Sequence, residues 1–205
     1  MLTHGAGDES DHWAGLIGPL ARDHSVVRWD LPGHGNSPEL PTDRYNRETC
    51  LDALDDMIEA AGPPAVLIGH SYGGYLSMAT AILHPEQVRA LVLVATGPGF
   101  RSEKGRARWN KGVAAYAERL GSPAAGLAHQ ADGMVSERLA EITAPILQVC
   151  GDRDSQFHAA LEHIESTVED VTTVVIESSG HAVASSHADQ VAMAIRAFLD
   201  RVPAP

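Results

Sequence analysis

The feature that most constrains this chain is a short apolar segment, residues 66–68, that runs directly into a Gly-x-Ser-x-Gly turn. The apolar segment is too short for a helix and is typical of a buried strand, and a helix-like segment follows the turn. A strand, a sharp turn and a helix together expose the turn's serine, Ser71. Such a turn strains the backbone and brings strand and helix almost into contact, so it needs glycines at positions such as Gly69 and Gly73. The alternative interpretation is an ordinary glycine turn between a strand and a helix.

Length and composition limit the kinds of protein in which this motif can occur. The 205 residues suit one domain with a single core, and 44% hydrophobic with 20% charged residues is ordinary for a soluble globular protein. The formal net charge of −12 argues against a nucleic-acid partner. Since no apolar run approaches the ~20 residues of a membrane span and no export signal is visible, we predict a cytoplasmic protein without a membrane partner.

The residues that commonly bind metals form no known metal-binding pattern. Cys50 and Cys150 show neither metal nor redox spacing, so reduced thiols are expected. None of the eleven histidines lies in a His-Glu-x-x-His or similar spacing. The glycine-rich residues 4–7 do not begin a dinucleotide fingerprint, because Ser10 stands where the third glycine belongs. We therefore predict no metal and no cofactor.

Apolar runs alternate with segments of helical periodicity along most of the chain. Strands are predicted at 1–3, 25–29, 66–68, 90–95, 145–150 and 172–176, and helices at 13–20, 51–61, 76–83 and 191–199. Ser10 or Asp11 is the expected N-cap of the first helix. Strands alternating with helices indicate an α/β fold with a parallel sheet.

Residues 97–143 interrupt this alternation, with helical patches but no predicted strand. They also concentrate basic side chains on an acidic chain: Arg101, Lys104, Arg106, Arg108 and Lys111. One interpretation is a lid whose charges attract an anionic substrate. The interpretation that we favour is a solvated helix face.

Two glycine-rich loops follow the first two strands. Residues 4–7, His-Gly-Ala-Gly, offer unhindered backbone N–H groups of the kind that stabilise an oxyanion, although a plain turn would have the same composition. His34 lies between two glycines in the loop 30–37, where a histidine bonded to the backbone is favoured over a catalytic one.

A serine hydroxyl needs a base to remove its proton and a third group to orient that base. Both are present after the serine turn. Asp152 and Asp154 follow the strand that ends at Cys150, and His181 follows the last strand. The order Ser, Asp, His is the order of the α/β-hydrolase triad.

With these pieces in place, the chain resembles the α/β-hydrolase family along nearly its whole length. The matching segments are 3–6, 30–37, 69–74, 151–154 and 180–181. The resemblance implies an α/β-hydrolase core at 1–96 and 144–205, a mostly parallel sheet flanked by helices, and a short helical cap at 97–143.

The resemblance also implies the roles of individual residues. Ser71 would be the nucleophile, His181 the general acid/base and Asp154 the orienting acid, with Asp152 as the alternative acid. The backbone N–H groups of Ala6 and Tyr72 would form the oxyanion hole. His70 is expected to be a packed histidine, and the side chain of Tyr72 is a possible pocket residue.

Two departures from the family pattern concern the start of the chain and the cap. The family normally has two further strands, an antiparallel pair, before the His-Gly loop, and the cap is short for a capped member. The strand at 25–29 is then expected to be an unprotected edge that exposes Val26, Val27 and Trp29, or the chain lacks its natural start.

The sequence therefore predicts a cofactor-independent serine hydrolase acting on a small ester, thioester or lactone. The alternatives are hydrolysis of a carbon–carbon bond with the same triad, a small-molecule binding protein on this scaffold, and a truncated, inactive product. The small-molecule acyl substrate is the one expected partner.

Overall fold

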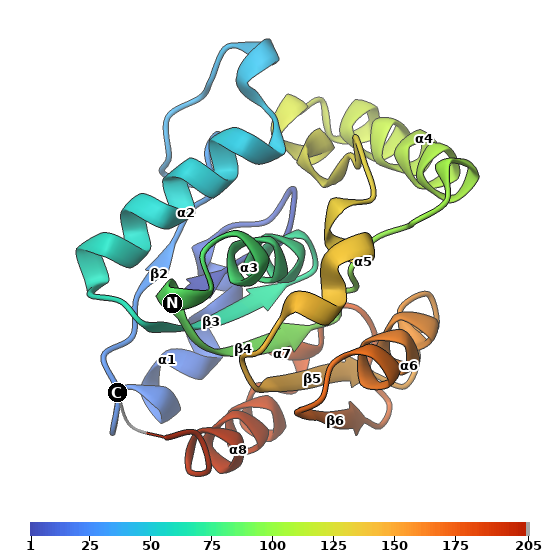
Figure 1. The fold of residues 1–205 in the computed structure, drawn as a ribbon. Helices are drawn as coiled ribbons and strands as arrows, with labels where there is room; N and C mark the ends of the chain where they lie inside the picture. The colour runs from blue at the N-terminus through green and yellow to red at the C-terminus, as the bar shows by residue number, and fades with distance from the viewer. Residues whose placement is uncertain (204–205) are drawn as a thin grey trace.

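A computed structural model describes residues 1–203 and shows one six-stranded sheet flanked by helices (Figure 1). All adjacent strands pair in parallel, in the order β2-β1-β3-β4-β5-β6. The strands are β1 (Leu2–Thr3), β2 (Arg28–Trp29), β3 (Ala65–His70), β4 (Val88–Val94), β5 (Ile146–Gly151) and β6 (Val171–Ile176). The predicted α/β fold with a parallel sheet is confirmed.

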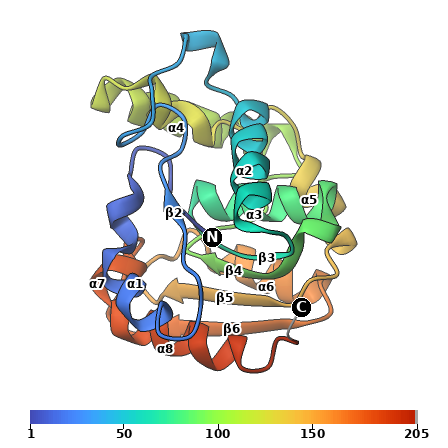
Figure 2. The ribbon, with the colours of Figure 1, turned by 90° about the vertical axis from the view of Figure 1, so that its left-hand side faces the viewer.

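Helices cover both faces of this sheet. They are α1 (Ala14–Leu20), α2 (Arg47–Ala61), α3 (Tyr72–Leu83), α4 (Glu103–Leu120), α5 (Met134–Arg138), α6 (His158–Thr167), α7 (Val183–Ser186) and α8 (Ala188–Leu199). Helices α1, α7 and α8 lie on one face, and α2, α3 and α6 lie on the other (Figures 1 and 2).

The central strands are apolar without interruption because both of their faces are buried. Along β4, Leu91 and Leu93 pack into the core beneath α2 and α3, whereas Ala90, Val92 and Val94 pack into the core beneath α1 and α8. Alternate residues of a strand point to opposite faces, so a strand covered on both sides needs apolar residues at every position.

The edge strand β2 is shorter than predicted. It pairs only through Arg28 and Trp29, because its neighbour β1 offers just Leu2 and Thr3. Its position at the sheet edge is as expected. The expected exposure of Trp29 is wrong: the side chain is buried, and its indole N–H donates to Thr3 Oγ1 at 3.0 Å.

The predicted N-cap of the first helix is also wrong. Ser10 and Asp11 lie inside a 3-10 turn, Ser10–Trp13, that precedes α1, and the N-cap position of α1 is taken by Trp13 without a side-chain hydrogen bond. The backbone N–H of Ser10 instead donates to Asp30 Oδ1 at 2.7 Å. A carboxylate from a distant loop thus replaces the local cap.

Between β4 and β5 the described chain contains helices α4 and α5 and short 3-10 turns. In Figure 1 this segment lies above the sheet, with α4 farthest from the strands. Neither α4 nor any other helix within residues 1–203 combines the length and apolar character needed to cross a membrane. Both cysteines are free and buried.

Candidate active site

Ser71 occupies the tight turn between β3 and α3. Its backbone has φ 50° and ψ −115°, a conformation that residues other than glycine rarely adopt. The neighbouring strand holds it there: Ser71 N–H donates to Val94 O at 2.9 Å, and Thr96 Oγ1 donates to Ser71 O at 2.6 Å. Strain that the surrounding structure maintains in this way is a common feature of functional sites.

The glycines flanking Ser71 are required by close backbone contacts. A Cβ atom at Gly69 would overlap the backbone of Gly73 and Gly74, and one at Gly73 would overlap the carbonyl of Thr3. The strand, the helix and the loop after β1 therefore approach each other as the sequence pattern predicts.

His181 and Asp154 meet at the carboxyl end of the sheet. His181 lies in the loop after β6, Asp154 lies in the loop after β5, and His181 Nδ1 is 2.7 Å from Asp154 Oδ2. A carboxylate can only accept, so Nδ1 carries the proton and Nε2 is left as a base. The Asp154 side chain is only 4% exposed, which strengthens its interaction with the ring.

Two residues that the sequence did not point to support this pair. Gln156 Nε2 donates to Asp154 Oδ1 at 3.1 Å, and the Phe157 ring stacks on the His181 ring at 5.3 Å between centroids. Both lie in the loop before α6, where no periodic pattern distinguishes them from other loop residues.

Asp152 points to the backbone and not to the His181 ring. Its Oδ1 accepts the Ser179 N–H at 3.0 Å, and backbone N–H donation, first from Ser178, lowers the pKa of this carboxyl. Asp152 therefore stabilises the turn that precedes His181.

His70 is buried, as expected, and also contacts His181. Its Nε2 donates to the backbone carbonyl of His181 at 3.0 Å, and the two rings lie 4.8 Å apart. Burial, together with the neighbouring His12 and His181, lowers the pKa of His70 to about 3, so its ring is neutral.

Ser71 and His181 line the same cavity. Within residues 1–203 the Ser71 hydroxyl forms no hydrogen bond to the His181 ring. Catalytic hydrogen bonds often tighten only when substrate binds, so shared access to one cavity is the relevant geometry here.

The loop after β1 lies beside the serine turn and presents free backbone donors. Among the described residues, the N–H groups of Ala6 and Tyr72 donate to no protein acceptor, and Tyr72 N–H belongs to the first turn of α3. The helix N-terminus adds its partial positive charge. An anionic oxygen beside Ser71 would be stabilised by such donors.

Two buried histidines hold this loop in place. His34 Nε2 accepts the Gly7 N–H at 2.9 Å, and His34 Nδ1 lies 3.1 Å from Pro32 O, which confirms the prediction of a backbone-bonded histidine. His4 Nε2 accepts the Leu31 N–H at 2.9 Å, and its Nδ1 donates to Gly5 O at 2.7 Å.

The burial of His4 predicts a pH dependence of stability. Burial lowers its pKa from 6.5 to about 4, so between these pH values the unfolded chain binds a proton that the folded chain does not. The contribution of His4 to the free energy of unfolding should therefore fall by about 3 kcal/mol as the pH drops through this window. Urea unfolding between pH 7 and pH 4 should be less pH-dependent in His4→Gln. In the control, substitution of the exposed His24 should leave the change of the free energy of unfolding with pH as it is in wild type. The same change with pH in His4→Gln as in wild type would contradict this role of His4.

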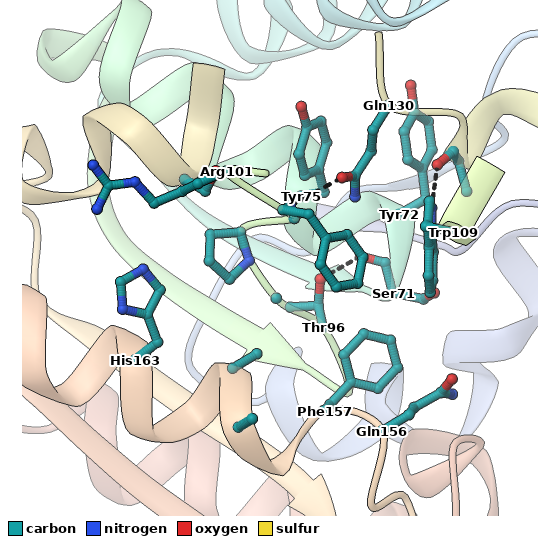
Figure 3. A pocket seen from close by; sticks show the side chains of 18 of the residues that line it. Ser71, Tyr72, Tyr75, Thr96, Arg101, Trp109, Gln130, Gln156, Phe157 and His163 are labelled. Carbon is teal, nitrogen blue, oxygen red and sulfur yellow. Dashed lines mark hydrogen bonds between the residues drawn. The ribbon is translucent and has the colours of Figure 1, made fainter. Parts of the chain in front are cut away.

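Two cavities meet at Ser71. The first, of about 500 Å³, extends between α3 and α6 and is lined by Tyr72, Phe157 and Ala159 among others (Figure 3). The second, of about 850 Å³, extends beneath α4 and includes His181. Trp109 of α4 lines both. The side chain of Tyr72, a possible pocket residue from the sequence, does line the first cavity.

Known proteins resemble this chain in sequence. A pimeloyl-[acyl-carrier protein] methyl ester esterase of Chromobacterium violaceum is 40% identical over 101 residues, which is 49% of this chain and 37% of that protein. The protein of the same name from Xanthomonas campestris pv. campestris is 28% identical over 247 aligned positions, covering 99% of this chain and 95% of that protein.

The fold has close counterparts among solved structures, and a family model matches most of the sequence. MenH from S. aureus superposes with a TM-score of 0.86 at 21% identity, over 97% of this chain and 92% of that one. This likeness shows the fold. The model of the alpha/beta hydrolase fold family matches residues 1–137. The chain therefore belongs to the alpha/beta hydrolase family, and the family together with its esterase-named relatives supports hydrolase activity.

Proposed function

We propose that this chain is a cofactor-independent serine hydrolase that cleaves a small ester, thioester or lactone through an acyl-enzyme on Ser71. The observation that carries the proposal is the hydrogen bond from His181 Nδ1 to the buried carboxylate of Asp154, with His181 and Ser71 lining one cavity. The relatives named as esterases support the same class of reaction.

In the first half of the reaction, Ser71 Oγ attacks the acyl carbon while its proton passes to His181 Nε2. The carbonyl oxygen becomes an oxyanion and accepts from the N–H groups of Ala6 and Tyr72. When the carbon–oxygen bond of the ester breaks, the imidazolium returns the proton to the leaving alcohol. Asp154 stays ionised and stabilises the imidazolium.

In the second half, water attacks the acyl-enzyme with His181 again acting as the base. The tetrahedral intermediate collapses, Ser71 Oγ regains its proton, and the carboxylic acid leaves. His181 must therefore face both the alcohol and the incoming water, which requires open space on its side of Ser71.

The positions of the two cavities assign the two parts of the substrate. His181 must protonate the leaving alcohol, so the alcohol lies in the larger cavity that His181 lines. The acyl chain then occupies the smaller cavity between α3 and α6, which contains Tyr72 and Phe157 but not His181. The apolar character of this cavity suits an uncharged acyl chain.

A matched pair of variants tests this assignment. Ala159 lines only the acyl-side cavity and Gly112 lines only the alcohol-side cavity, and both are exposed positions that tolerate a larger side chain. In Ala159→Leu, kcat/KM should fall for esters with long acyl chains and stay close to wild type for short acyl chains on bulky alcohols. Gly112→Leu should have the opposite preference.

The measurement is hydrolysis of two ester series, one graded in acyl length and one graded in alcohol size. Absence of hydrolysis of every ester, thioester and lactone by wild type would contradict the proposed reaction class. Hydrolysis with the two preferences exchanged would retain the reaction but reverse the assignment of the cavities.

A further inference from the structure

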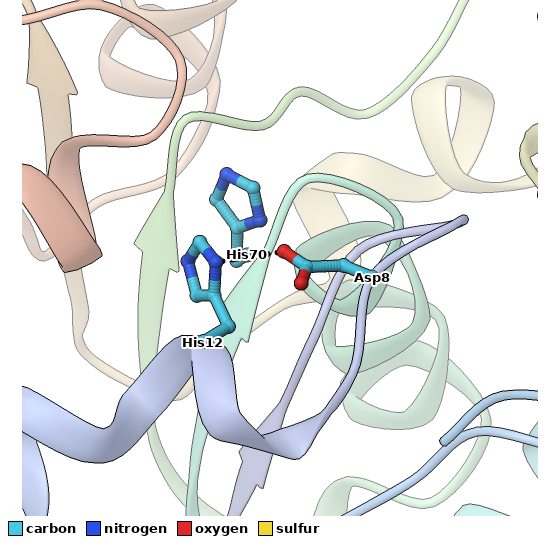
Figure 4. Close-up of side chains that lie close together, drawn as sticks. All are labelled: Asp8, His12 and His70. Carbon is cyan, nitrogen blue, oxygen red and sulfur yellow. Dashed lines mark ion pairs between the residues drawn. The ribbon is translucent and has the colours of Figure 1, made fainter.

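The side chains of three potential metal ligands, which come from separate segments of the chain, lie close together. Asp8 belongs to the loop after β1, His12 to the 3-10 turn before α1, and His70 to the end of β3 (Figure 4). One donor atom from each lies within 4.8 Å of the other two. In Figure 4 both rings direct a nitrogen toward the Asp8 carboxylate.

The hydrogen bonds of this cluster involve only one nitrogen of each imidazole ring. His12 Nδ1 is 2.7 Å from Asp8 Oδ2, and His70 Nε2 is occupied by the His181 carbonyl. His70 Nδ1 and His12 Nε2 are buried and have no hydrogen-bond partner within the described chain. His70 is only 4% exposed, so its unpaired nitrogen is not satisfied by bulk solvent.

The electrostatic arrangement favours a cation. Because Nε2 of His70 carries the proton, its Nδ1 presents a lone pair toward a carboxylate. The Asp8 carboxylate lies within this arrangement: its Oδ2 is 2.7 Å from His12 Nδ1, and its Oδ1 accepts the Glu9 backbone N–H at 2.9 Å. A lone pair and an anion repel each other unless a positive charge lies between them.

We propose that Asp8, His12 and His70 form a binding site for one divalent transition-metal ion, with Zn²⁺ as the best-fitting ion. Two imidazoles and one carboxylate are a typical Zn²⁺ donor set, and Mg²⁺ and Ca²⁺ prefer oxygen ligands. The site adjoins the cavity proposed for the alcohol, but the argument for metal binding does not depend on the proposed chemistry at Ser71.

Binding requires a rearrangement, because the His12 and His70 rings stack at 4.2 Å between centroids and one ring must turn to direct both nitrogens at one ion. Tetrahedral Zn²⁺ with ligands at about 2.1 Å places neighbouring donors about 3.4 Å apart, so the widest separation must close by roughly an ångström. Asp8 lies in a loop and its side chain is 36% exposed, so it is the ligand free to move. All three residues line the larger cavity, which leaves room for a water as the fourth ligand.

Binding has a structural consequence because the ion would join three segments of the chain. It would tie the loop after β1, the turn before α1 and the end of β3 to each other. The folded chain binds such an ion and the unfolded chain does so much more weakly, so the melting temperature should rise with the Zn²⁺ concentration.

The test is a titration of the purified, chelator-treated protein with Zn²⁺, followed by calorimetry and by the melting temperature. Wild type should bind one equivalent and melt at a higher temperature with Zn²⁺ than without it. Asp8→Asn and His12→Gln should weaken binding by about a hundredfold or more and lose the rise in melting temperature. With Co²⁺, wild type should give the intense visible bands of a tetrahedral site.

A matched control is His84→Gln. His84 also lies beside carboxylates, at 3.4 Å from Asp55 and 3.9 Å from Glu86, but within residues 1–203 it belongs to no cluster of three ligand atoms like this one. This variant should bind Zn²⁺ like wild type. Any of three results would overturn the proposal: no stoichiometric binding by wild type, unchanged binding in both Asp8→Asn and His12→Gln, or loss of binding only in His181→Gln. The last result would place the ion on the Asp154–His181 pair.

Discussion

In Ser71→Ala, ester hydrolysis should fall by about four orders of magnitude or more, because members of a triad act as a unit and the remaining residues cannot form the acyl-enzyme. The free energy of unfolding should change by less than about 1 kcal/mol. The Ser71 backbone is held by Val94 O and Thr96 Oγ1, and these contacts do not involve its hydroxyl. Alanine can therefore take the same place in the turn.

Two measurements on the purified variant check this expectation together. Steady-state hydrolysis gives the loss of kcat, and urea unfolding gives the stability. Native-like unfolding with almost no turnover is the expected pair of results. Substantial hydrolysis by a Ser71→Ala preparation free of contaminating esterases would rule out Ser71 as the nucleophile.

The second large effect is expected at Asp154. Asp154→Asn should lower kcat by about a thousandfold or more at neutral pH, because an amide can donate to Nδ1 and so favour the tautomer with its proton on Nε2. That tautomer cannot remove the proton from Ser71 Oγ. Because the Asp154 side chain is only 4% exposed, water cannot easily take over the hydrogen bond that its carboxylate accepts from His181.

Asp152→Asn is the matched control, since it makes the same chemical change two residues away. Asp152 accepts the Ser179 N–H and does not reach the His181 ring, so the variant should be slightly less stable than wild type and keep most of its turnover. Parallel kinetic assays and urea unfolding of the two variants distinguish the roles. The reverse ranking of turnover would make Asp152 the orienting acid.

The sequence predicts the fold well where the signal is local. β3, β4 and β5 are continuous apolar runs, and the glycines beside Ser71 reflect backbone contacts that a Cβ atom would block. Loops at the carboxyl ends of parallel strands share one edge of the sheet, so an acid after β5 is expected to meet His181; the sequence leaves both Asp152 and Asp154 open, and Asp154 makes the contact.

Other features depend on tertiary contacts that leave no local pattern. The N-cap prediction at Ser10 fails because Ser10 begins a 3-10 turn ahead of α1, and the N–H of this first residue donates to Asp30 from another loop. Trp29 is buried because its indole finds Thr3 on the adjacent strand. The cluster of Asp8, His12 and His70 has no recognisable spacing, since β3 brings His70 to the other two from a distant part of the sequence.

The position of α4 is the clearest example. Its sequence predicts helical patches and basic side chains, and the structure adds that Trp109 lies between two cavities. How α4 lies relative to the sheet depends on packing between segments far apart in sequence, so the division of space around Ser71 could not be predicted. The roles of Ser71, Asp154, His181, Ala6 and Tyr72 in catalysis stay predictions that the variants test.

The measurement that tests the central claim most directly is labelling of wild-type protein with a fluorophosphonate, followed by peptide mapping by mass spectrometry. An activated serine attacks the phosphorus and keeps the probe, whereas an ordinary surface serine does not react. We expect one label per chain, located on Ser71, and no label in Ser71→Ala. An unlabelled wild type, or a label on a different residue, would contradict this expectation.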